Sequence, residues 1–180
     1  MSAAEKEIII AIRVQNQFGV LSRVSGMVSR RGFNIDTLTV SATETPGVSR
    51  ITISLKGDDY TRNQMIKQLS KLHEVLEVSE MGNSSVTRDL LLIKIKTTSQ
   101  NRQDAMDAVN VFRGSVVDFA GDSLIIQLAG DVKKIDAFIE LMKPFGIIEM
   151  CRTGLISLER GKKCLKDSSM NYINRLDQEV

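Results

Sequence analysis

The order of predicted strands and helices occurs twice along this chain, and that repeat narrows the possible folds more than any other feature. Two dipeptides mark equivalent points in the copies: Arg31-Gly32 returns as Arg113-Gly114, and Gly57-Asp58 returns as Gly130-Asp131. Each copy reads strand, helix, strand, strand, helix, strand, and the copies meet near residues 82–85. The 180 residues suffice for two small domains of this plan.

The first copy shows the periodicities that distinguish strands from helices. Residues 8–12 form an apolar run typical of a strand, while residues 35–43 and 49–56 alternate apolar with polar side chains, as half-buried strands do. Residues 75–78 are predicted to form its last strand. Two helices are predicted from apolar side chains at helical spacing, with the faces Val20, Val24, Met27, Val28 and Met65, Ile66, Leu69, Leu72.

The second copy repeats this pattern. Strands are predicted at residues 90–95, 116–119 and 124–128, with a closing strand at 147–158 that Gly154 can interrupt. The two predicted helices have the apolar faces Ala105, Met106, Val109, Phe112 and Val132, Ile135, Phe138, Ile139, Met142. The sequence therefore predicts an α+β protein made of two tandem ferredoxin-like βαββαβ units.

In a ferredoxin-like sheet, with strand order 4-1-3-2, the second strand lies at an edge. Exposed edges are usually protected by Lys, Pro or a bulge, and residues 35–43 contain no Lys or Pro and give no sign of a bulge. An unprotected edge of this kind is expected to pair with the second strand of a twofold-related copy. We therefore expect a homodimer.

The junction between the first strand and the first helix is the candidate binding site. Gly19 lies at the start of the helix, where the missing Cβ lets a ligand approach the backbone. The N–H groups of a first helical turn have no intrahelical partners and favour an anion such as a carboxylate. The Asn16 amide can address a second polar group of a small zwitterion. A simple capped turn explains the same pattern equally well, and residues 98–102 of the second copy lack it.

Composition and strand content argue against nucleic acid and membranes as partners. A net charge of +2 is too small to indicate either, and no apolar run approaches the roughly 20 residues of a membrane span. RNA-recognition domains share the βαββαβ order, but they stack bases on aromatic side chains of the central strands. The predicted central strands here, residues 8–14 and 49–56, contain no aromatic side chain.

No arrangement of residues typical of catalysis or metal binding is present in the sequence. His73 is the only histidine, and no Ser or Cys is placed with it and a positioning acid at a spacing known for nucleophilic catalysis. Cys151 and Cys164 lack CxxC spacing and histidine neighbours, so they are expected to be buried small side chains or unused thiols. We therefore predict no catalytic residue and no metal ligand.

Both ends of the chain are polar. The first seven residues lack the apolar core of a signal peptide, which predicts a cytoplasmic protein, or a plastid protein if a transit peptide has been removed. Residues 161–180 carry only a faint helical stripe, made of Met170, Ile173 and Leu176. This polar tail is expected to be frayed or to form a short docking helix.

The loop that begins at Asn16 resembles the ligand loop of ACT domains, which are amino-acid-sensing βαββαβ modules. More closely, the chain is similar to the regulatory (small) subunit of acetohydroxyacid synthase, also called acetolactate synthase, over about residues 6–161. The motifs that carry this resemblance are Asn16-x-x-Gly19-x-Leu21-Ser22-Arg23, Arg31-Gly32-Phe33-Asn34-Ile35, Leu38-Thr39-Val40, Ser49-Arg50-Ile51-Thr52-Ile53, Phe112-Arg113-Gly114, Leu128-Ala129-Gly130, Lys134-Ile135-Asp136-Ala137-Phe138 and Arg152-Thr153-Gly154.

The resemblance implies a non-catalytic subunit in branched-chain amino-acid biosynthesis. It would activate a separate catalytic subunit and make that subunit sensitive to feedback inhibition by valine. Residues 6–82 would form the ACT domain, 86–160 the C-terminal ferredoxin-like domain of the small subunit, and 161–180 a tail. No cofactor is expected on this chain; thiamine diphosphate, Mg²⁺ and FAD would belong to the catalytic partner.

The resemblance also implies a valine site between the ACT domains of a homodimer. One subunit would contribute Asn16, Gln17, Phe18, Gly19, Val20 and Leu21, and the other would contribute Asn34 and Ile35. Leucine and isoleucine stay open as effectors. The alternative is a free-standing transcriptional regulator that binds an amino acid, which would need a helix-turn-helix or a strongly basic face, and the sequence shows neither.

Overall fold

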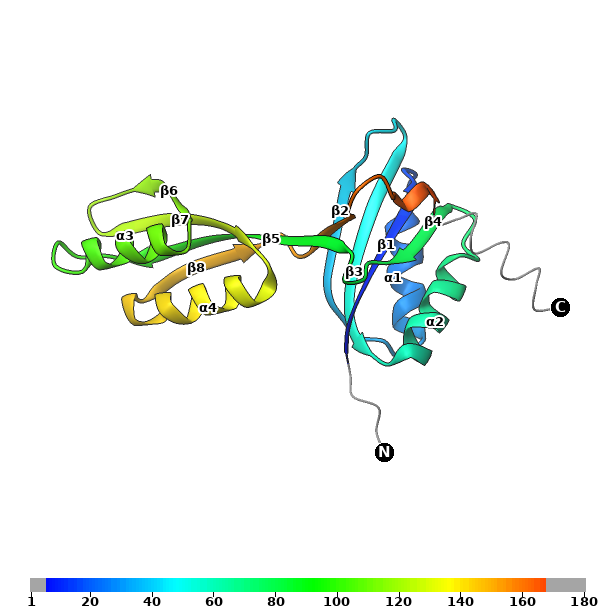
Figure 1. The fold of residues 1–180 in the computed structure, drawn as a ribbon, viewed down its shortest axis with the longest axis horizontal. Helices are drawn as coiled ribbons and strands as arrows, with labels where there is room; N and C mark the ends of the chain where they lie inside the picture. The colour runs from blue at the N-terminus through cyan, green and yellow to red at the C-terminus, as the bar shows by residue number, and fades with distance from the viewer. Residues whose placement is uncertain (1–5, 168–180) are drawn as a thin grey trace. The chain divides into compact units, whose positions relative to one another are not determined.

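The computed structural model describes residues 6–167, which divide into two compact units (Figure 1). The first unit comprises residues 6–86 together with 155–167, and the second comprises residues 87–154. The first unit contains β1 (Lys6–Gln15), α1 (Val20–Arg30), β2 (Ile35–Ala42), β3 (Val48–Gly57), α2 (Asp59–Leu69), β4 (Val75–Glu80) and β9 (Ile156–Glu159). The second contains most of β5 (Ser85–Lys96), α3 (Arg102–Val111), β6 (Ser115–Phe119), β7 (Ser123–Gly130), α4 (Val132–Met142), the 3₁₀ turn η1 (Lys143–Phe145) and β8 (Ile147–Arg152).

Both units have the predicted ferredoxin-like topology. The first sheet has the strand order β2-β3-β1-β4 and the second has β6-β7-β5-β8, with β9 paired to β5 outside that path. The pairs β1–β3, β1–β4 and β2–β3 are all antiparallel. The predicted α+β class and the strand order 4-1-3-2 are confirmed. No helix among residues 6–167 is long and apolar enough to span a membrane.

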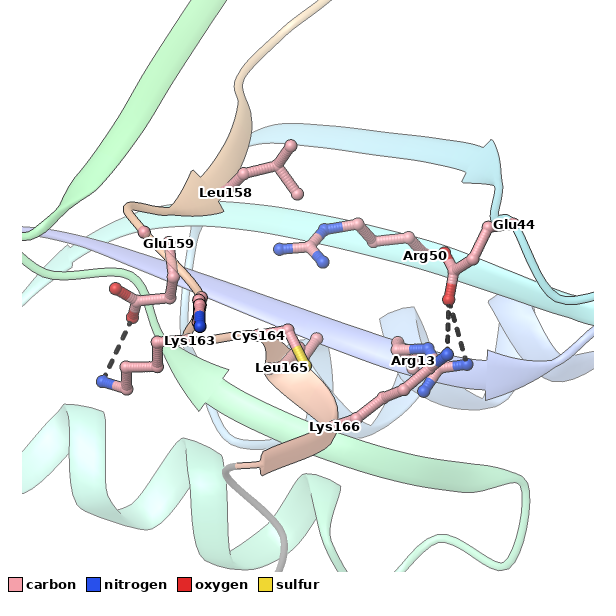
Figure 2. A pocket seen from close by; sticks show the side chains of 11 residues that line it. Arg13, Glu44, Arg50, Leu158, Glu159, Lys163, Cys164, Leu165 and Lys166 are labelled. Carbon is pink, nitrogen blue, oxygen red and sulfur yellow. Dashed lines mark ion pairs between the residues drawn. The ribbon is translucent and has the colours of Figure 1, made fainter.

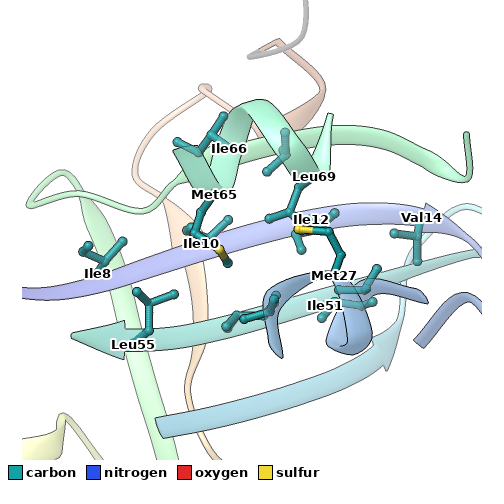
Figure 3. Packing of buried hydrophobic residues seen from close by; sticks show 14 of the residues in the cluster. Ile8, Ile10, Ile12, Val14, Met27, Ile51, Leu55, Met65, Ile66 and Leu69 are labelled. Atoms are coloured by element: carbon teal, nitrogen blue, oxygen red, sulfur yellow. The ribbon is translucent and has the colours of Figure 1, made fainter. Parts of the chain in front are cut away.

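The core of the first unit lies between its sheet and its two helices (Figure 3). Alternate residues of β1 point into it because side chains alternate between the faces of a strand. The predicted face of α1 packs against them, since residues three and four apart share one side of a helix. The strand residues are Ile8, Ile10, Ile12, Val14, Ile51, Ile53, Leu55 and Val78, and the helix residues are Val20, Val24, Met27, Val28, Met65, Ile66 and Leu69.

In the second unit, a buried carboxylate holds the end of β8 against β5. Asp89 is buried and accepts hydrogen bonds from Arg152 Nε at 2.6 Å and Thr153 Oγ1 at 3.2 Å. Gly154, with φ of 80°, follows at once. A left-handed residue at this point ends the strand, so the closing strand predicted at 147–158 is interrupted at Gly154, as the sequence allowed, and forms two strands, β8 and β9.

The C-terminal segment of the described chain, residues 155–167, crosses the face of the first sheet that the helices leave open (Figure 1). Leu165 is only 4% exposed and packs with Ile9, Ala11 and Met81. The expectation of a frayed tail is therefore wrong for residues 161–167, because one leucine buries itself on the sheet. The stripe Met170, Ile173, Leu176 lies outside the described residues. Both cysteines are free and exposed, which excludes buried side chains, the first of the two expected alternatives, and leaves unused thiols.

The edge strand β2 is less regular and more exposed than the sequence suggests. Its register shifts between Ile35 and Thr37, so the expectation of a strand without a bulge is wrong at its start. Leu38 and Val40 lie opposite Ile53 and Ile51, on the helix-covered side of the sheet, yet they are 36% and 46% exposed. An edge strand has a neighbour on one side only, and this row lies outside the cluster between sheet and helices.

Candidate functional site

The loop between β1 and α1 is held in place by backbone hydrogen bonds on both sides. The N–H of Gln15 donates to the carbonyl of Glu74 at 2.9 Å, and the N–H of Asn16 donates to that of Gly47 at 2.8 Å. Gly19 then turns the chain into the helix with φ of 81°, a left-handed conformation that favours glycine. The predicted role of Gly19 as the junction residue therefore has a direct conformational cause.

The first turn of α1 leaves the amide groups of Leu21 and Ser22 available, while the N–H of Val20 donates to the Gln17 carbonyl at 3.4 Å. Its N-cap is Gly19, which has no side chain to cap the helix, and the turn contains no acidic residue. Among the residues that the structure describes, the N–H groups of Gly19, Leu21 and Ser22 have no hydrogen-bond acceptor. Unpaired amides together with the positive end of the helix dipole favour an anion at this position.

Two of the other helices, α2 and α4, have a side-chain cap at their first turn. Asp58 caps α2 and accepts a hydrogen bond from the Thr61 N–H at 2.8 Å, which lowers the pKa of the Asp58 carboxyl. Asp131 caps α4 in the same way, accepting from the Lys134 N–H at 2.8 Å. The start of α1 has no such Asp, and an Asp cap would occupy the space that an external anion would take.

The helix α3 corresponds to α1 in the second unit and also has no side-chain cap, but its first turn carries an acidic residue where that of α1 carries none. The Asn101 Oδ1 atom accepts a hydrogen bond from the Thr98 N–H at 2.7 Å, and Asp104 lies in the first turn. A carboxylate there already complements the helix dipole and would repel a second anion. Within the part of the chain described, the geometry therefore favours α1 over α3 as the anion site.

Arg23 completes the surroundings of the loop and was not predicted as a site residue. Its guanidinium donates to the Phe18 carbonyl at 3.4 Å and forms an ion pair with Glu74 at 2.7 Å. A Cβ added to Gly19 would lie 3.2 Å from Arg23 Nη1, so the side chain closely approaches the glycine. A spacing of four residues places two helical positions on one face, and this is the signal that could have identified Arg23.

The predicted loop residues differ in what they can offer a ligand. Asn16, Gln17 and Phe18 are exposed, and the ring of Phe18 is fully so. Leu21 is 44% exposed beside them. The Val20 side chain belongs to the core, so this residue could meet a ligand only through its backbone.

The remaining two predicted site residues lie at the other end of α1. Asn34 is exposed and Ile35 is partly buried against the core, both just after Gly32, whose φ is 74°. An 11-residue helix spans about 16 Å, so one protomer does not bring Asn34 to the Asn16 loop. A site that uses both ends needs two chains.

The side chains at this site are suited to recognising a small ligand. The amide side chains of Asn16 and Gln17 can donate and accept hydrogen bonds, and Phe18 and Leu21 supply apolar surface. Within residues 6–167 there is no group of three or more His, Cys, Asp or Glu side chains that could hold a metal ion.

Two family models match the chain, one for each unit. Residues 10–77 match the model described as the AHAS small subunit-like ACT domain, and residues 88–161 match the model described as the small subunit of acetolactate synthase. Both models therefore agree with the resemblance inferred from the sequence motifs.

Individual proteins show the same similarity along most of the chain. A probable acetolactate synthase small subunit from Archaeoglobus fulgidus is 47% identical over 86% of this chain and 97% of its own length. The acetolactate synthase isozyme 3 small subunit of Salmonella typhimurium is 39% identical over 88% and 98%. The crystal structure of the Thermotoga maritima small subunit matches with a TM-score of 0.82 and 36% identity, over 88% of this chain and 99% of that one.

Two glycines of α1 allow a matched test of the junction. Gly19→Ala is expected to lower the free energy of unfolding by about 1 kcal/mol, because alanine disfavours the left-handed conformation and its Cβ meets Arg23. Gly26→Ala is expected to raise it by about 0.5–1 kcal/mol, since Gly26 is helical with nothing within 4 Å of an added Cβ. Urea unfolding followed by circular dichroism measures both. Equal effects of the two variants would contradict the left-handed junction.

Proposed function

The chain belongs to the family of acetolactate synthase small subunits, and we propose that it regulates a separate catalytic subunit by binding valine at the start of α1. A regulatory, non-catalytic role accords with the small-subunit names of its relatives and with the ACT domain matched at residues 10–77. These relatives are bacterial and archaeal, so they lend no support to a plastid location.

The open first turn of α1 is the observation that carries the proposal. A valine carboxylate would accept hydrogen bonds from the N–H groups of Leu21 and Ser22, which have no acceptor among residues 6–167. The Asn16 side chain, also without a partner in that part of the chain, would meet the ammonium group through its amide oxygen. Leucine and isoleucine share both charged groups, so the pocket walls would select among the three.

A second copy of the chain would close the site from its other side. Asn34 and Ile35 of that copy would approach the Asn16 loop when the two β2 edges pair antiparallel. The exposed Leu38 and Val40 on the edge strand would then be buried across the twofold axis. Such an interface is isologous, as expected for a homodimer.

The catalytic partner would supply the chemistry. A small subunit implies a larger one, which we expect to carry thiamine diphosphate, Mg²⁺ and FAD. When valine binds at the ACT interface, the subunit described here would change the shape or stability of the catalytic subunit. No observation on the structure favours the alternative of a transcriptional regulator.

The proposed dimer predicts a difference between two exposed valines on edge strands. Val40→Lys on β2 is expected to raise the dimer dissociation constant by about 10- to 100-fold, because two like charges would meet near the twofold axis. Val117→Lys on β6 is the matched control; Val117 is 52% exposed on the corresponding edge of the second sheet. Sedimentation equilibrium measures both. A monomeric wild-type chain at micromolar concentration, or equal weakening by both variants, would contradict the β2 interface.

The valine site predicts graded losses of inhibition. Gly19→Asp places a carboxylate where the ligand carboxylate would lie, and should abolish inhibition by valine through charge repulsion. Asn34→Ala removes one amide at a cost of about 1–3 kcal/mol, so the inhibitory valine concentration should rise about 10- to 100-fold. The measurement is acetolactate formation by the cognate catalytic subunit mixed with each variant, across a series of valine concentrations.

Two controls test whether the loss of valine inhibition arises at the start of α1. Asn101→Asp makes the corresponding change at the start of α3 and should leave valine inhibition unchanged. Gly19→Asp and Asn34→Ala should both still activate the catalytic subunit, because sensing and activation are expected to use different surfaces. Normal valine sensitivity in Gly19→Asp would show that the pocket is misplaced, and loss of activation in both variants would place the loop in the contact with the enzyme.

A further inference from the structure

A cavity of about 380 Å³ lies on the outer face of the first sheet, beneath the C-terminal segment (Figure 2). Arg13 of β1 and Arg50 of β3 contribute side chains from the sheet, and Lys162, Lys163 and Lys166 contribute from the segment. This volume is within the range of small-molecule sites. The cavity lies on the opposite side of the sheet from the helices, so it is separate from the start of α1.

The two arginines form a like-charged pair that the fold holds together. Arg13 and Arg50 are directly opposite in the β1–β3 register, an arrangement that is destabilising for equal charges. Arg13 is only 6% exposed, and Arg50 is partly buried. The buried Nε atom of each has no hydrogen-bond partner among the described residues. Burial and the neighbouring Arg13 both lower the pKa of Arg50.

Carboxylates offset only part of this positive charge. Glu77 pairs with Arg13 at 3.0 Å, and Glu44 lies 3.9 Å from Arg13 and 2.7 Å from Lys166. The hydrogen bond from Lys166 lowers the pKa of Glu44 to about 2, so Glu44 is charged at neutral pH. Arg50 donates to the Ser157 carbonyl at 2.6 Å, and neither Arg50 nor Lys162 forms an ion pair within residues 6–167.

We propose that this cavity binds a small multivalent anion carrying phosphoryl groups. Five cations line the cavity, and three carboxylates offset them: Glu44 and Glu159 in the lining, with Glu159 paired to Lys163 at 3.5 Å, and Glu77 beside Arg13. Guanidinium groups present planar pairs of N–H donors that fit phosphate oxygens, and lysines add mobile point charges. A phosphoryl anion in the cavity beside Arg13 and Arg50 would offset the repulsion between the two guanidinium groups.

Part of the site comes from a segment beyond the matched family region. The second family model ends at Gly161, whereas Lys162, Lys163 and Lys166 follow it. The buried Leu165 anchors this segment, so the lysines are held over the sheet by packing. Cys164 also lines the cavity and is exposed, which provides a chemical probe of occupancy.

Pyrophosphate binding to the full chain tests the proposal. Calorimetry at constant ionic strength should show one site per chain, and saturating pyrophosphate should slow alkylation of Cys164 about tenfold or more by covering it. Cys151, the other exposed cysteine, lies in the second unit and should react at an unchanged rate. Orthophosphate and ATP in separate titrations distinguish a free phosphate from a nucleotide as the source of the phosphoryl groups.

A matched pair of charge-reversal variants tests whether pyrophosphate binds in this cavity. Lys162→Glu should raise the pyrophosphate dissociation constant about tenfold or more, and Lys67→Glu, an exposed residue on α2, should leave it unchanged. Three results would overturn the proposal: no pyrophosphate binding by the wild type, equal effects of the two reversals, or sulfate and citrate binding as tightly as pyrophosphate. The last result would indicate a general counter-ion site.

Discussion

The N–H groups of Gly19, Leu21 and Ser22 at the start of α1 have no acceptor within the described residues, and the candidate anion site of the first unit depends on them. Gly19 enters the helix in a left-handed conformation and brings no capping side chain. A glycine N-cap costs only about a few tenths of a kcal/mol relative to a Ser, Thr, Asp or Asn cap, and the packing of α1 on the sheet offsets this. The same turn thus stays open to a carboxylate from outside, whereas α2 and α4 close theirs with Asp58 and Asp131.

Most of the fold could be predicted because it follows from periodicity. The helical face of Val20, Val24, Met27 and Val28 and the alternation of the strands identified both units and their strand order. The packing of residues 161–167 could not be predicted, because a single leucine among lysines carries no periodic signal. The pairing of Arg13 with Arg50 depends on the register of β1 against β3. A shift of this register by two residues would keep the same side chains buried while changing the pair.

The two proposed sites of the first unit lie close to one short stretch of chain. Glu74 accepts the Gln15 N–H through its carbonyl and pairs with Arg23 beside the α1 loop. Glu77, three residues further, pairs with Arg13 in the wall of the cavity. Glu74, just before β4, and Glu77, within it, therefore contact the α1 loop and the cavity respectively. The loop could be identified from the sequence, but the role of Arg23 and Glu74 could not. These two residues come together only when β4 lies beside β1.

The most direct test of the valine site is a two-dimensional NMR spectrum of the isotope-labelled chain titrated with valine. If valine binds at the start of α1, the amide signals of Gly19, Leu21 and Ser22 will shift most, together with those of Asn34 and Ile35. The signals of residues 98–102 will not respond. Saturable valine binding that leaves Gly19, Leu21 and Ser22 unshifted, or that shifts the loop before α3 instead, would contradict a valine site at the start of α1.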